Sequence, residues 1–184
     1  MGRISNPDAK AEFLEGAVEY LLRGGLQDLS LRPLAEALGT NARMLLYYFG
    51  SKENLIVEAL TAAQARQQAF LQAQPQSSAD PVAGLRRFWN WFSSPELAPY
   101  ARLLYEIEVL GLKGNAEYQN FAKAAIHGWI SFVQQGLGAA PAQASLIVSV
   151  FSGLLIDRLI TGETERVNAV FEAFVKALER GEAI

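Results

Sequence analysis

The stretch SLRPLAEALGTNARMLLYYFGSK, residues 30–52, carries the signals for two short helices separated by a tight turn. Ser30 is a residue type that caps helix N-termini, and we expect its hydroxyl to accept a backbone N–H bond. Leu34 and Leu38 follow at the spacing of one helical face. Gly39 ends the helix, because a left-handed C-terminal residue is least costly as glycine. The pattern predicts a bihelical unit, although an ordinary helical hairpin in a core would look similar.

The second helix of this unit has its own start signal and apolar face. Thr40 and Asn41 are both residue types that cap a helix. Leu45 and Tyr48 then form the apolar face, and Ala35 is small where the two helices must approach closely. This combination is more specific than a lone glycine between two helices.

The longer segment GLQDLSLRPLAEALGTNARMLLYYFGSKENL, residues 25–55, resembles the N-terminal domain of the tetracycline-repressor-like (TetR) family of transcription regulators. The resemblance is specific over residues 13–60. Leu46 departs from the family pattern, which usually has tyrosine there, whereas Tyr48 is within family variation. The resemblance implies a homodimer that binds a double-stranded DNA operator and a small effector. The residues that carry it are Gly25, Ser30, Leu34, Ala35, Leu38, Gly39, Leu45, Phe49, Ser51, Lys52 and Glu53.

The composition favours a folded protein in the cytoplasm. The chain has 184 residues, of which 51% are apolar, so disorder is not expected. Cysteine is absent, which excludes disulfides and thiol ligands. We find no apolar run that approaches a membrane span, no secretory leader and no metal-ligand cluster. No cofactor is therefore expected.

The net charge of −3 is not distributed evenly. Residues 1–52 contain six basic and six acidic side chains, so the deficit lies in residues 53–184. A near-neutral DNA-binding segment must work through a few placed cations and through dimerisation, not through a broad basic field.

Periodicity and caps divide the chain into about nine helices and no strand. We expect a three-helix helix-turn-helix DNA-binding domain over residues 1–52 and a larger helical effector-binding and dimerisation domain over residues 53–184. The expected helices cover about 7–24, 31–38, 41–49, 51–73, 80–92, 94–111, 115–136, 141–161 and 163–180, with a linker at 74–78.

In a helix-turn-helix unit the second helix enters the major groove, and side chains near its N-terminus meet the base edges. Leu45 must face inward, so its neighbours face outward. Arg43 is the best base reader, because a guanidinium pairs with both O6 and N7 of guanine. Ala42, Met44 and Leu46 can pack on thymine methyl groups.

Further contacts surround this helix. The Tyr47 hydroxyl can reach a phosphate or a base, and the family resemblance implies that Arg32 reaches the groove and that Lys52 contacts a phosphate. Each cation taken alone is equally compatible with an ordinary solvated surface charge. The predicted DNA-binding residues are Arg32, Asn41, Ala42, Arg43, Met44, Leu46, Tyr47, Tyr48 and Lys52.

The larger domain contains an aromatic-rich stretch and two strongly apolar C-terminal helices. From the residues alone a plain core is favoured for the aromatic stretch, whereas the resemblance implies an effector pocket for an apolar or aromatic ligand. The C-terminal helices have more apolar surface than one neighbour covers, which favours a dimer interface over burial in one subunit. The predicted pocket residues are Phe88, Trp89, Phe92, Arg102, Tyr105, Glu106, His127 and Trp129; the predicted interface residues are Val150, Leu154, Val170, Phe171 and Phe174.

Two other classes of function remain as alternatives. A helical protein-interaction module would use the exposed Met44, Leu46 and Tyr47 for a protein partner. A small helical enzyme is the weaker alternative, because the single His127 lacks a nucleophile motif and no phosphate-binding glycine pattern follows a strand. We therefore predict a ligand-responsive repressor and not an enzyme.

Overall fold

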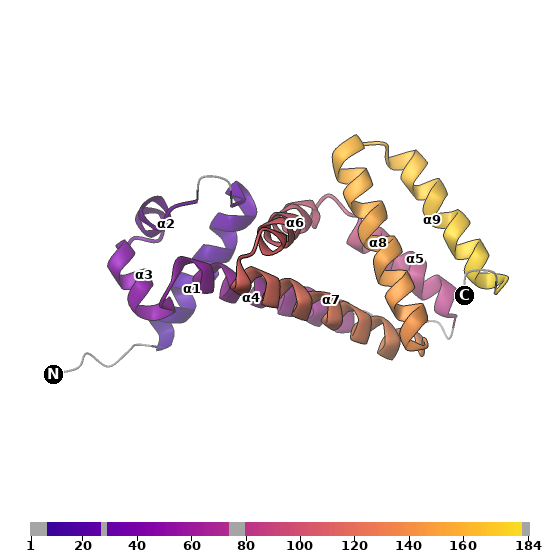
Figure 1. Ribbon diagram of the computed structural model, residues 1–184, viewed down its shortest axis with the longest axis horizontal. Coiled ribbons are helices and arrows are strands. Elements are labelled where there is room, and N and C mark those ends of the chain that lie inside the picture. The colour runs from indigo at the N-terminus through magenta and orange to yellow at the C-terminus, as the bar shows by residue number, and fades with distance from the viewer. Residues whose placement is uncertain (1–6, 27–28, 74–79, 182–184) are drawn as a thin grey trace. The chain divides into compact units, whose positions relative to one another are not determined.

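The computed structural model describes residues 7–26, 29–73 and 80–181, and in these ranges the chain forms helices and no strand (Figure 1). The predicted all-α class is confirmed. The nine helices of the described ranges are α1 (Pro7–Gly24), α2 (Leu31–Ala37), α3 (Ala42–Phe49), α4 (Lys52–Ala73), α5 (Pro81–Phe92), α6 (Ala98–Leu112), α7 (Ala116–Leu137), α8 (Pro141–Thr161) and α9 (Thr164–Glu179).

The chain forms two compact units. The first unit contains residues 1–75 and 102–122, and the second contains residues 76–101 and 123–184. The chain passes from one unit to the other within α6 and again within α7. The functional division predicted after residue 52 stays a prediction, because packing units and functional domains need not coincide. The predicted linker at 74–78 lies outside the described residues.

Most helix ends follow the local signals in the sequence. The Asp80 carboxylate accepts a hydrogen bond from the Val82 N–H at 2.9 Å, and the Ser51 hydroxyl accepts one from Asn54 N–H at 2.9 Å. The predicted start of α6 at Ser94 is four residues too early. Residues 94–97 form a turn instead, closed by the bond from Leu97 N–H to the Ser94 carbonyl at 3.2 Å.

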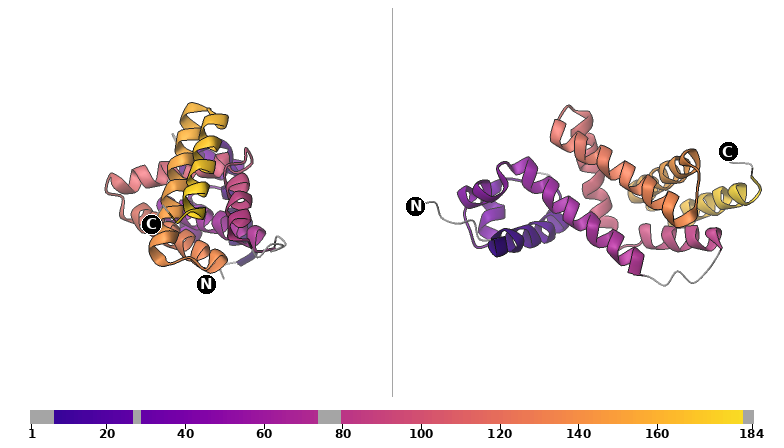
Figure 2. Two further views of the ribbon diagram at one scale, coloured as in Figure 1. Left: turned by 90° about the vertical axis from the view of Figure 1, so that its right-hand side faces the viewer. Right: turned by 90° about the horizontal axis from the view of Figure 1, so that it is seen from below.

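In the first unit, α1 packs along α4. Ala17 and Leu21 from α1 and Ile56 from α4 are buried in this core. The Lys10 ammonium forms an ion pair with Glu58 at 2.8 Å, and Arg66 forms another with Glu15. The right-hand view of Figure 2 shows α4 as one unbroken helix that extends past the three-helix bundle. The helix predicted from residue 51 to about residue 73 is thus present.

Gly16 lies in the middle of α1 at a point of close approach. A Cβ atom added there would overlap the Leu38 side chain, so no residue larger than glycine fits without a shift of Leu38. Glycine in a helix interior destabilises it by roughly 1 kcal/mol relative to alanine. Glycine at position 16 therefore lowers helix propensity but allows Leu38 to pack closely against α1.

The core of the second unit is built from α5, α8 and α9. Trp89 of α5 stacks on Phe171 of α9 with ring centroids 5.0 Å apart, and its indole N–H donates to Asn168 Oδ1 at 3.0 Å. Phe151 of α8 packs edge-on to both rings. The burial of large aromatic side chains at this junction supplies much of the apolar area that the unit removes from water.

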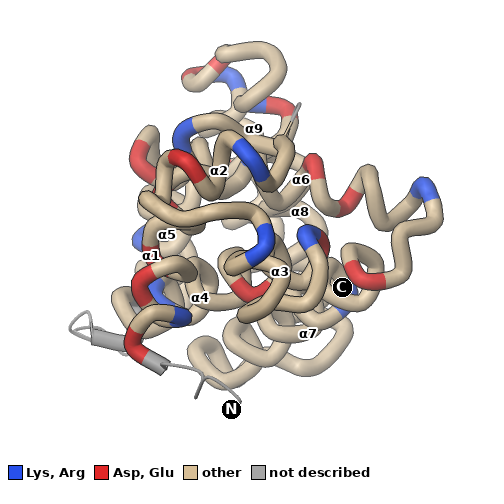
Figure 3. The backbone as a smooth tube through the Cα atoms, turned by 90° about the vertical axis from the view of Figure 1, so that its left-hand side faces the viewer, with Lys and Arg blue, Asp and Glu red and all other residues tan. Residues whose placement is uncertain are grey.

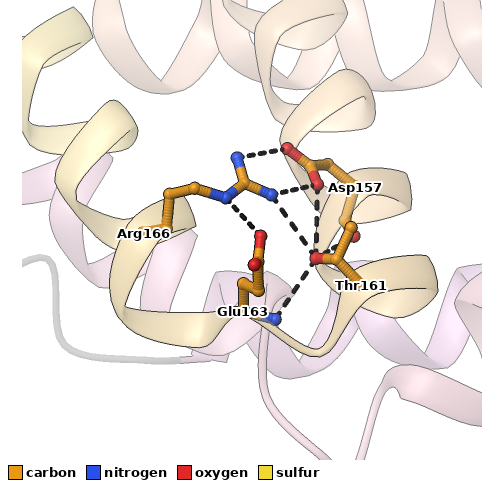
Figure 4. Close-up of polar contacts among 4 residues, drawn as sticks. All are labelled: Asp157, Thr161, Glu163 and Arg166. Carbon is orange, nitrogen blue, oxygen red and sulfur yellow. Dashed lines mark hydrogen bonds and ion pairs between the residues drawn. The ribbon is translucent and has the colours of Figure 1, made fainter.

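A polar cluster closes the connection between α8 and α9 (Figure 4). The Arg166 guanidinium donates to both carboxylate oxygens of Asp157, at 2.6 and 3.0 Å, and to Glu163 at 2.5 Å. The Arg166 hydrogen bond lowers the pKa of the Asp157 carboxyl. Gly162 has a φ of 72°, the left-handed value that ends α8.

Among the described residues, α8 is long and apolar enough to cross a membrane by length and composition alone. This corrects the expectation that no segment approaches that length. Its residues Ile147, Phe151 and Leu155 are buried within the second unit.

Candidate nucleic-acid interface

α2, the turn after it and α3 pack as a compact bihelical unit. Leu34 and Ala35 of α2 and Leu45 and Phe49 of α3 are all buried. Gly39 has a φ of 65°, and Thr40 N–H bonds back to the Ala35 carbonyl at 2.9 Å, which closes the turn. The two helices predicted from residues 30–52 are therefore present, with their apolar faces toward each other.

The caps of these two helices differ from each other. Asn41 Oδ1 accepts a hydrogen bond from Met44 N–H at 3.0 Å, so Asn41 caps α3 as predicted. Ser30 occupies the N-cap position of α2, but its side chain makes no cap hydrogen bond. The predicted hydroxyl bond of Ser30 is wrong, so the start of α2 depends on its apolar packing.

The outward face of α3 combines one cation with apolar side chains. Arg43, Leu46 and Tyr47 are exposed, with Leu46 at 42% and Tyr47 at 56%. The half-buried Met44 and Ala42 flank them. The predicted outward orientation is confirmed for the first three side chains and is partial for the other two.

Tyr48 lies at the edge of this face and is half-buried. Its ring contacts Phe13 of α1 at 5.6 Å and Tyr47 at 5.2 Å, both edge-on. This row of three rings ties the outer wall of α3 to α1, which holds the Tyr47 ring in place. Tyr48 thus acts as a support for the face as much as a part of it.

The three predicted DNA-contacting cations differ in their intramolecular bonds. Arg32 pairs with Glu36 one turn later at 3.1 Å, and the Lys52 ammonium donates to the Leu29 carbonyl at 3.3 Å. Arg43 has no hydrogen bond or ion pair within the part of the chain that the structure describes. Figure 3 shows the Lys and Arg positions of α2 and α3 as separate points and not as a continuous basic stripe. This matches the expectation of few, placed cations.

Sequence reasoning missed one contact that positions the bihelical unit. Glu106 of α6, predicted as a pocket residue, accepts a hydrogen bond from Leu26 N–H at 2.7 Å. Leu26 follows Gly25, whose φ is 68° and whose added Cβ would come within 3.0 Å of the Glu106 carboxylate. The partners are 80 residues apart, so no local signal predicts the bond. It ties α6 to the segment that leads into α2.

A helix-turn-helix with a buried internal core and an exposed, cation-bearing second helix defines the class of DNA-binding regulators. Residues 13–59 match the family model of the bacterial regulatory proteins, tetR family. Residues 13–59 therefore form a DNA-binding domain of the TetR family of transcriptional regulators. No curated protein matches the chain.

Solved structures share the fold over nearly the whole chain. A transcriptional regulator from Rhodococcus sp. Rha1 superimposes with a TM-score of 0.77 at 15% identity, covering 95% of this chain and 98% of that one. The regulator SCO7518 from Streptomyces coelicolor A3(2) gives 0.76 at 17% identity, covering 92% and 98%. The multidrug binding protein EbrR, complexed with proflavin, gives 0.69 at 20% identity, covering 90% and 98%. At identities this low, the superpositions show a common fold and nothing more.

The predicted effector-pocket residues fall in both units. Arg102, Tyr105 and Glu106 belong to the first unit, with Arg102 exposed and the other two half-buried. Phe88, Trp89, Phe92, His127 and Trp129 belong to the second unit, where His127 is exposed. Trp89 is a core residue with its indole N–H bonded to Asn168. The pocket as a whole stays a prediction.

Part of the predicted set does cluster inside the second unit. Phe88 stacks on Phe92 at 5.5 Å and contacts Trp129 at 5.7 Å, and Phe132 lies beside Trp129 at 5.8 Å. Trp129 is 6% exposed, and its indole N–H has no hydrogen-bond partner among the described atoms. A buried donor without a partner is rare in a settled core.

The predicted interface residues on α8 and α9 also differ in exposure. Val170 is 45% exposed, and Val150 and Phe174 are half-buried. Leu154 and Phe171 are buried within the second unit at 9% and 2% exposure, so their own subunit covers them. The exposed residues of α8 are Pro141, Ala142, Ser149, Gly153, Ile156, Ile160 and Thr161.

Proposed function

We propose that this protein is a homodimeric, ligand-responsive repressor that binds a two-fold symmetric DNA operator through α3. The observation that carries the proposal is the outward face of α3, where the exposed Arg43 has no hydrogen bond or ion pair to any described residue and lies beside Tyr47. An unpaired guanidinium on the second helix of this motif is suited to major-groove contact.

Contacts to DNA phosphates complete the interface in this proposal. Lys52 is the first residue of α4, where free backbone N–H groups favour an anion such as a DNA phosphate. Its ammonium carries three N–H donors, and the bond to Leu29 uses one of them. Lys52 can therefore hold the loop before α2 and contact a phosphate at the same time.

Binding of the full-length protein to DNA selected from a random pool tests this proposal. Arg43→Ala should lower operator affinity by about 5- to 150-fold, which corresponds to roughly 1–3 kcal/mol. Arg23→Ala is the matched control, because Arg23 is an exposed arginine at the end of α1, outside the proposed face. Equal losses for the two variants would contradict the assignment of α3.

The salt dependence separates DNA binding from the alternative of a protein-interaction module. Contacts to phosphates release counterions, so affinity should fall steeply with salt, and Lys52→Ala should lower that slope by about 1. An apolar contact between Leu46 and a protein partner predicts a shallow slope. Salt titrations of the wild-type and Lys52→Ala proteins on one operator therefore discriminate between the two.

Dimerisation through α8 and α9 is supported by apolar side chains that face solvent. Ile160 is 77% exposed, Val170 is 45% and Ile156 is 38%. Gly153 and Ala173 are small and exposed on the same helices, which permits close approach of a second copy. A self-complementary patch of this kind suits a two-fold dimer, which a symmetric operator requires.

The aromatic cluster of the second unit supports an effector site. Phe88, Phe92 and Trp129 present flat apolar surface, and the Trp129 indole N–H offers one donor to a ligand acceptor. EbrR, which shares the fold, has been solved with proflavin. We therefore propose a planar aromatic effector, with proflavin as the first probe.

Effector binding reduces DNA affinity in this proposal by moving α4 and α6. α6 begins in the second unit and carries Glu106. The Glu106 carboxylate accepts a hydrogen bond from the N–H of Leu26, which precedes the bihelical unit of α2 and α3. Coupling requires that the effector bind the two conformations with different affinity. Tryptophan quenching by proflavin should accompany a loss of operator affinity. Quenching with unchanged operator affinity would contradict the coupling, and DNA binding would stand.

We further propose that the regulator acts in the cytoplasm. We assign it no catalytic activity and no cofactor. Within the described residues, no group of three or more His, Asp or Glu side chains gathers as a metal site.

A further inference from the structure

The exposed face of α3 has a definite order of side chains around the helix. Leu45 and Phe49 are buried, and Arg43 and Tyr47, four residues apart, are centred on the opposite side. Leu46 lies beside Arg43 at a spacing of three residues, which makes the two side chains neighbours on the surface. Any ligand that approaches this face meets Arg43 and Leu46 together.

The chemistry of this face is selective because few groups on it can read a base. α3 has the sequence ARMLLYYF, which contains no Asp, Glu, Asn or Gln. The oxygen of the nearby Asn41 amide is used by Met44 N–H in the cap. Carboxylates accept from cytosine and carboxamides pair with adenine, so α3 carries neither of these readers.

Arg43 and Leu46 are the two exposed side chains of α3 whose chemistry matches a single base, whereas the Tyr47 hydroxyl both donates and accepts and so selects none. Arg43 has no intramolecular hydrogen bond or ion pair among the described residues, so its planar fork is available for the O6 and N7 atoms of guanine. Leu46 exposes 42% of its surface and offers only methyl groups, which suit the C5-methyl group of thymine. Met44 and Ala42 are half-buried and have less surface to offer.

Spacing along the helix relates these two readers to neighbouring base pairs. Three residues advance an α-helix by about 4.5 Å, and stacked bases repeat every 3.4 Å or so. The advance along the helix is close to one base step, so Arg43 and Leu46 suit adjacent base pairs. It is too short for two base pairs that lie two steps apart.

We infer that each α3 reads a guanine through Arg43 and a thymine at an adjacent base pair through Leu46, with thymine recognised by its methyl group. The inference rests on the proposed function, because it requires that α3 enter the major groove. It specifies the operator chemistry. Every half-site contains this guanine and this thymine, and α3 makes no selective contact to a cytosine or an adenine.

Base analogues test each contact at a single atom in a selected operator. Replacement of guanine by 7-deazaguanine removes N7, and replacement of thymine by deoxyuridine removes only the methyl group. Wild-type affinity should fall by about fivefold or more at the guanine and by about threefold at the thymine. Arg43→Ala should be insensitive to the first analogue, and Leu46→Ala should be insensitive to the second.

Control variants keep the test independent of folding. Arg43→Lys retains the charge but lacks the planar fork, so it should keep the salt slope, bind less tightly and respond less to 7-deazaguanine. Circular dichroism and thermal unfolding confirm that each variant is folded. Salt-dependent binding by the wild type with no response to either analogue overturns this inference and leaves the proposed function standing. Absence of any salt-dependent DNA binding overturns both.

Discussion

Asn41 shows how one side chain prepares α3 for contact. Its side-chain oxygen accepts a hydrogen bond from Met44 N–H at 3.0 Å, in addition to the bond from that N–H to the Asn41 carbonyl at 3.0 Å. The sequence could predict a cap at Thr40 or Asn41, but it could not choose between them, because both are cap-forming residue types. The choice depends on the path of the turn, and the turn is set by Gly39 and the bond from Thr40 to Ala35.

Asn41→Ala should lower the free energy of unfolding by about 1 kcal/mol, because the cap bond to Met44 is lost. Asn41→Ser should stay within a few tenths of a kcal/mol of the wild type, because serine caps about as well. Urea unfolding monitored by circular dichroism gives both values. An equal loss for both variants would show that the side chain contributes through something other than the cap.

Glu106→Ala should expose the Leu26 N–H, since its acceptor at 2.7 Å is removed. We expect a loss of about 1–3 kcal/mol in stability, because the bond is partly buried and its acceptor is a carboxylate. Amide hydrogen exchange at Leu26 is the direct measurement, and its protection should fall. Glu106→Gln keeps an acceptor oxygen and should retain most of the protection; equal exchange in both variants would contradict this role.

At the scale of elements, the helices could be predicted because their caps and periodicity are local. α4, α5 and α8 end where proline, glycine and capping residues indicate. The start of α6 could not be placed, because residues 94–97 look like a helix start and instead form a turn. The sequence also could not predict which face of α9 packs inward, because Phe171 is buried against Trp89, which lies far away in the sequence.

The close contact of Gly16 with Leu38 leads to a prediction that runs against helix propensity. Gly16→Ala should lower stability by about 1–3 kcal/mol, because the new methyl group overlaps the Leu38 side chain. Leu38→Ala in the same chain should remove the overlap, so the double variant should lose less than the sum of the single losses. Additive losses in urea unfolding would show that the two positions are not in contact.

The α8–α9 connection predicts a pH-dependent contribution to stability. Hydrogen bonding to Arg166 lowers the pKa of the Asp157 carboxyl below the usual value for aspartate, about 3.9. The ionised carboxylate therefore stabilises the folded state above about pH 4, and this contribution disappears as pH falls through the lowered pKa. Asp157→Asn should lower the urea midpoint at pH 7, and its difference from the wild type should shrink toward pH 2.

Glu165→Gln is the matched control for this measurement. Glu165 is an exposed carboxylate in the first turn of α9, and the described residues include no ion pair for it. It should leave the midpoint at pH 7 nearly unchanged. A constant difference between Asp157→Asn and the wild type across the pH range would contradict the assigned cause.

At the scale of the whole molecule, the sequence could predict a regulator because residues 13–59 carry a specific motif. It could not predict how the chain divides into packing units, because that depends on contacts between distant helices such as the bond from Leu26 to Glu106. The sequence also could not predict which face of α8 is exposed. Leu154 and Ile156 are both apolar, and only packing makes the first buried and the second exposed.

The proposed dimer gives a matched pair of substitutions. Val170→Glu on α9 should shift the protein toward monomer, because a charge replaces an apolar side chain that is 45% exposed at the proposed interface. Val109→Glu on α6 alters a side chain that is 49% exposed but lies outside that interface. Analytical ultracentrifugation should show dissociation for the first variant only. Dimers of both variants would rule out the α9 face as the interface.

Selection of bound sequences from a random DNA pool, using the full-length protein, tests the central claim most directly. The account predicts a two-fold symmetric consensus with adjacent guanine and thymine in each half-site. The half-site centres should lie about 10 base pairs, or a multiple of that, apart. A pool that shows no enrichment, or an enriched sequence without two-fold symmetry, would contradict the claim that two copies of α3 read DNA together.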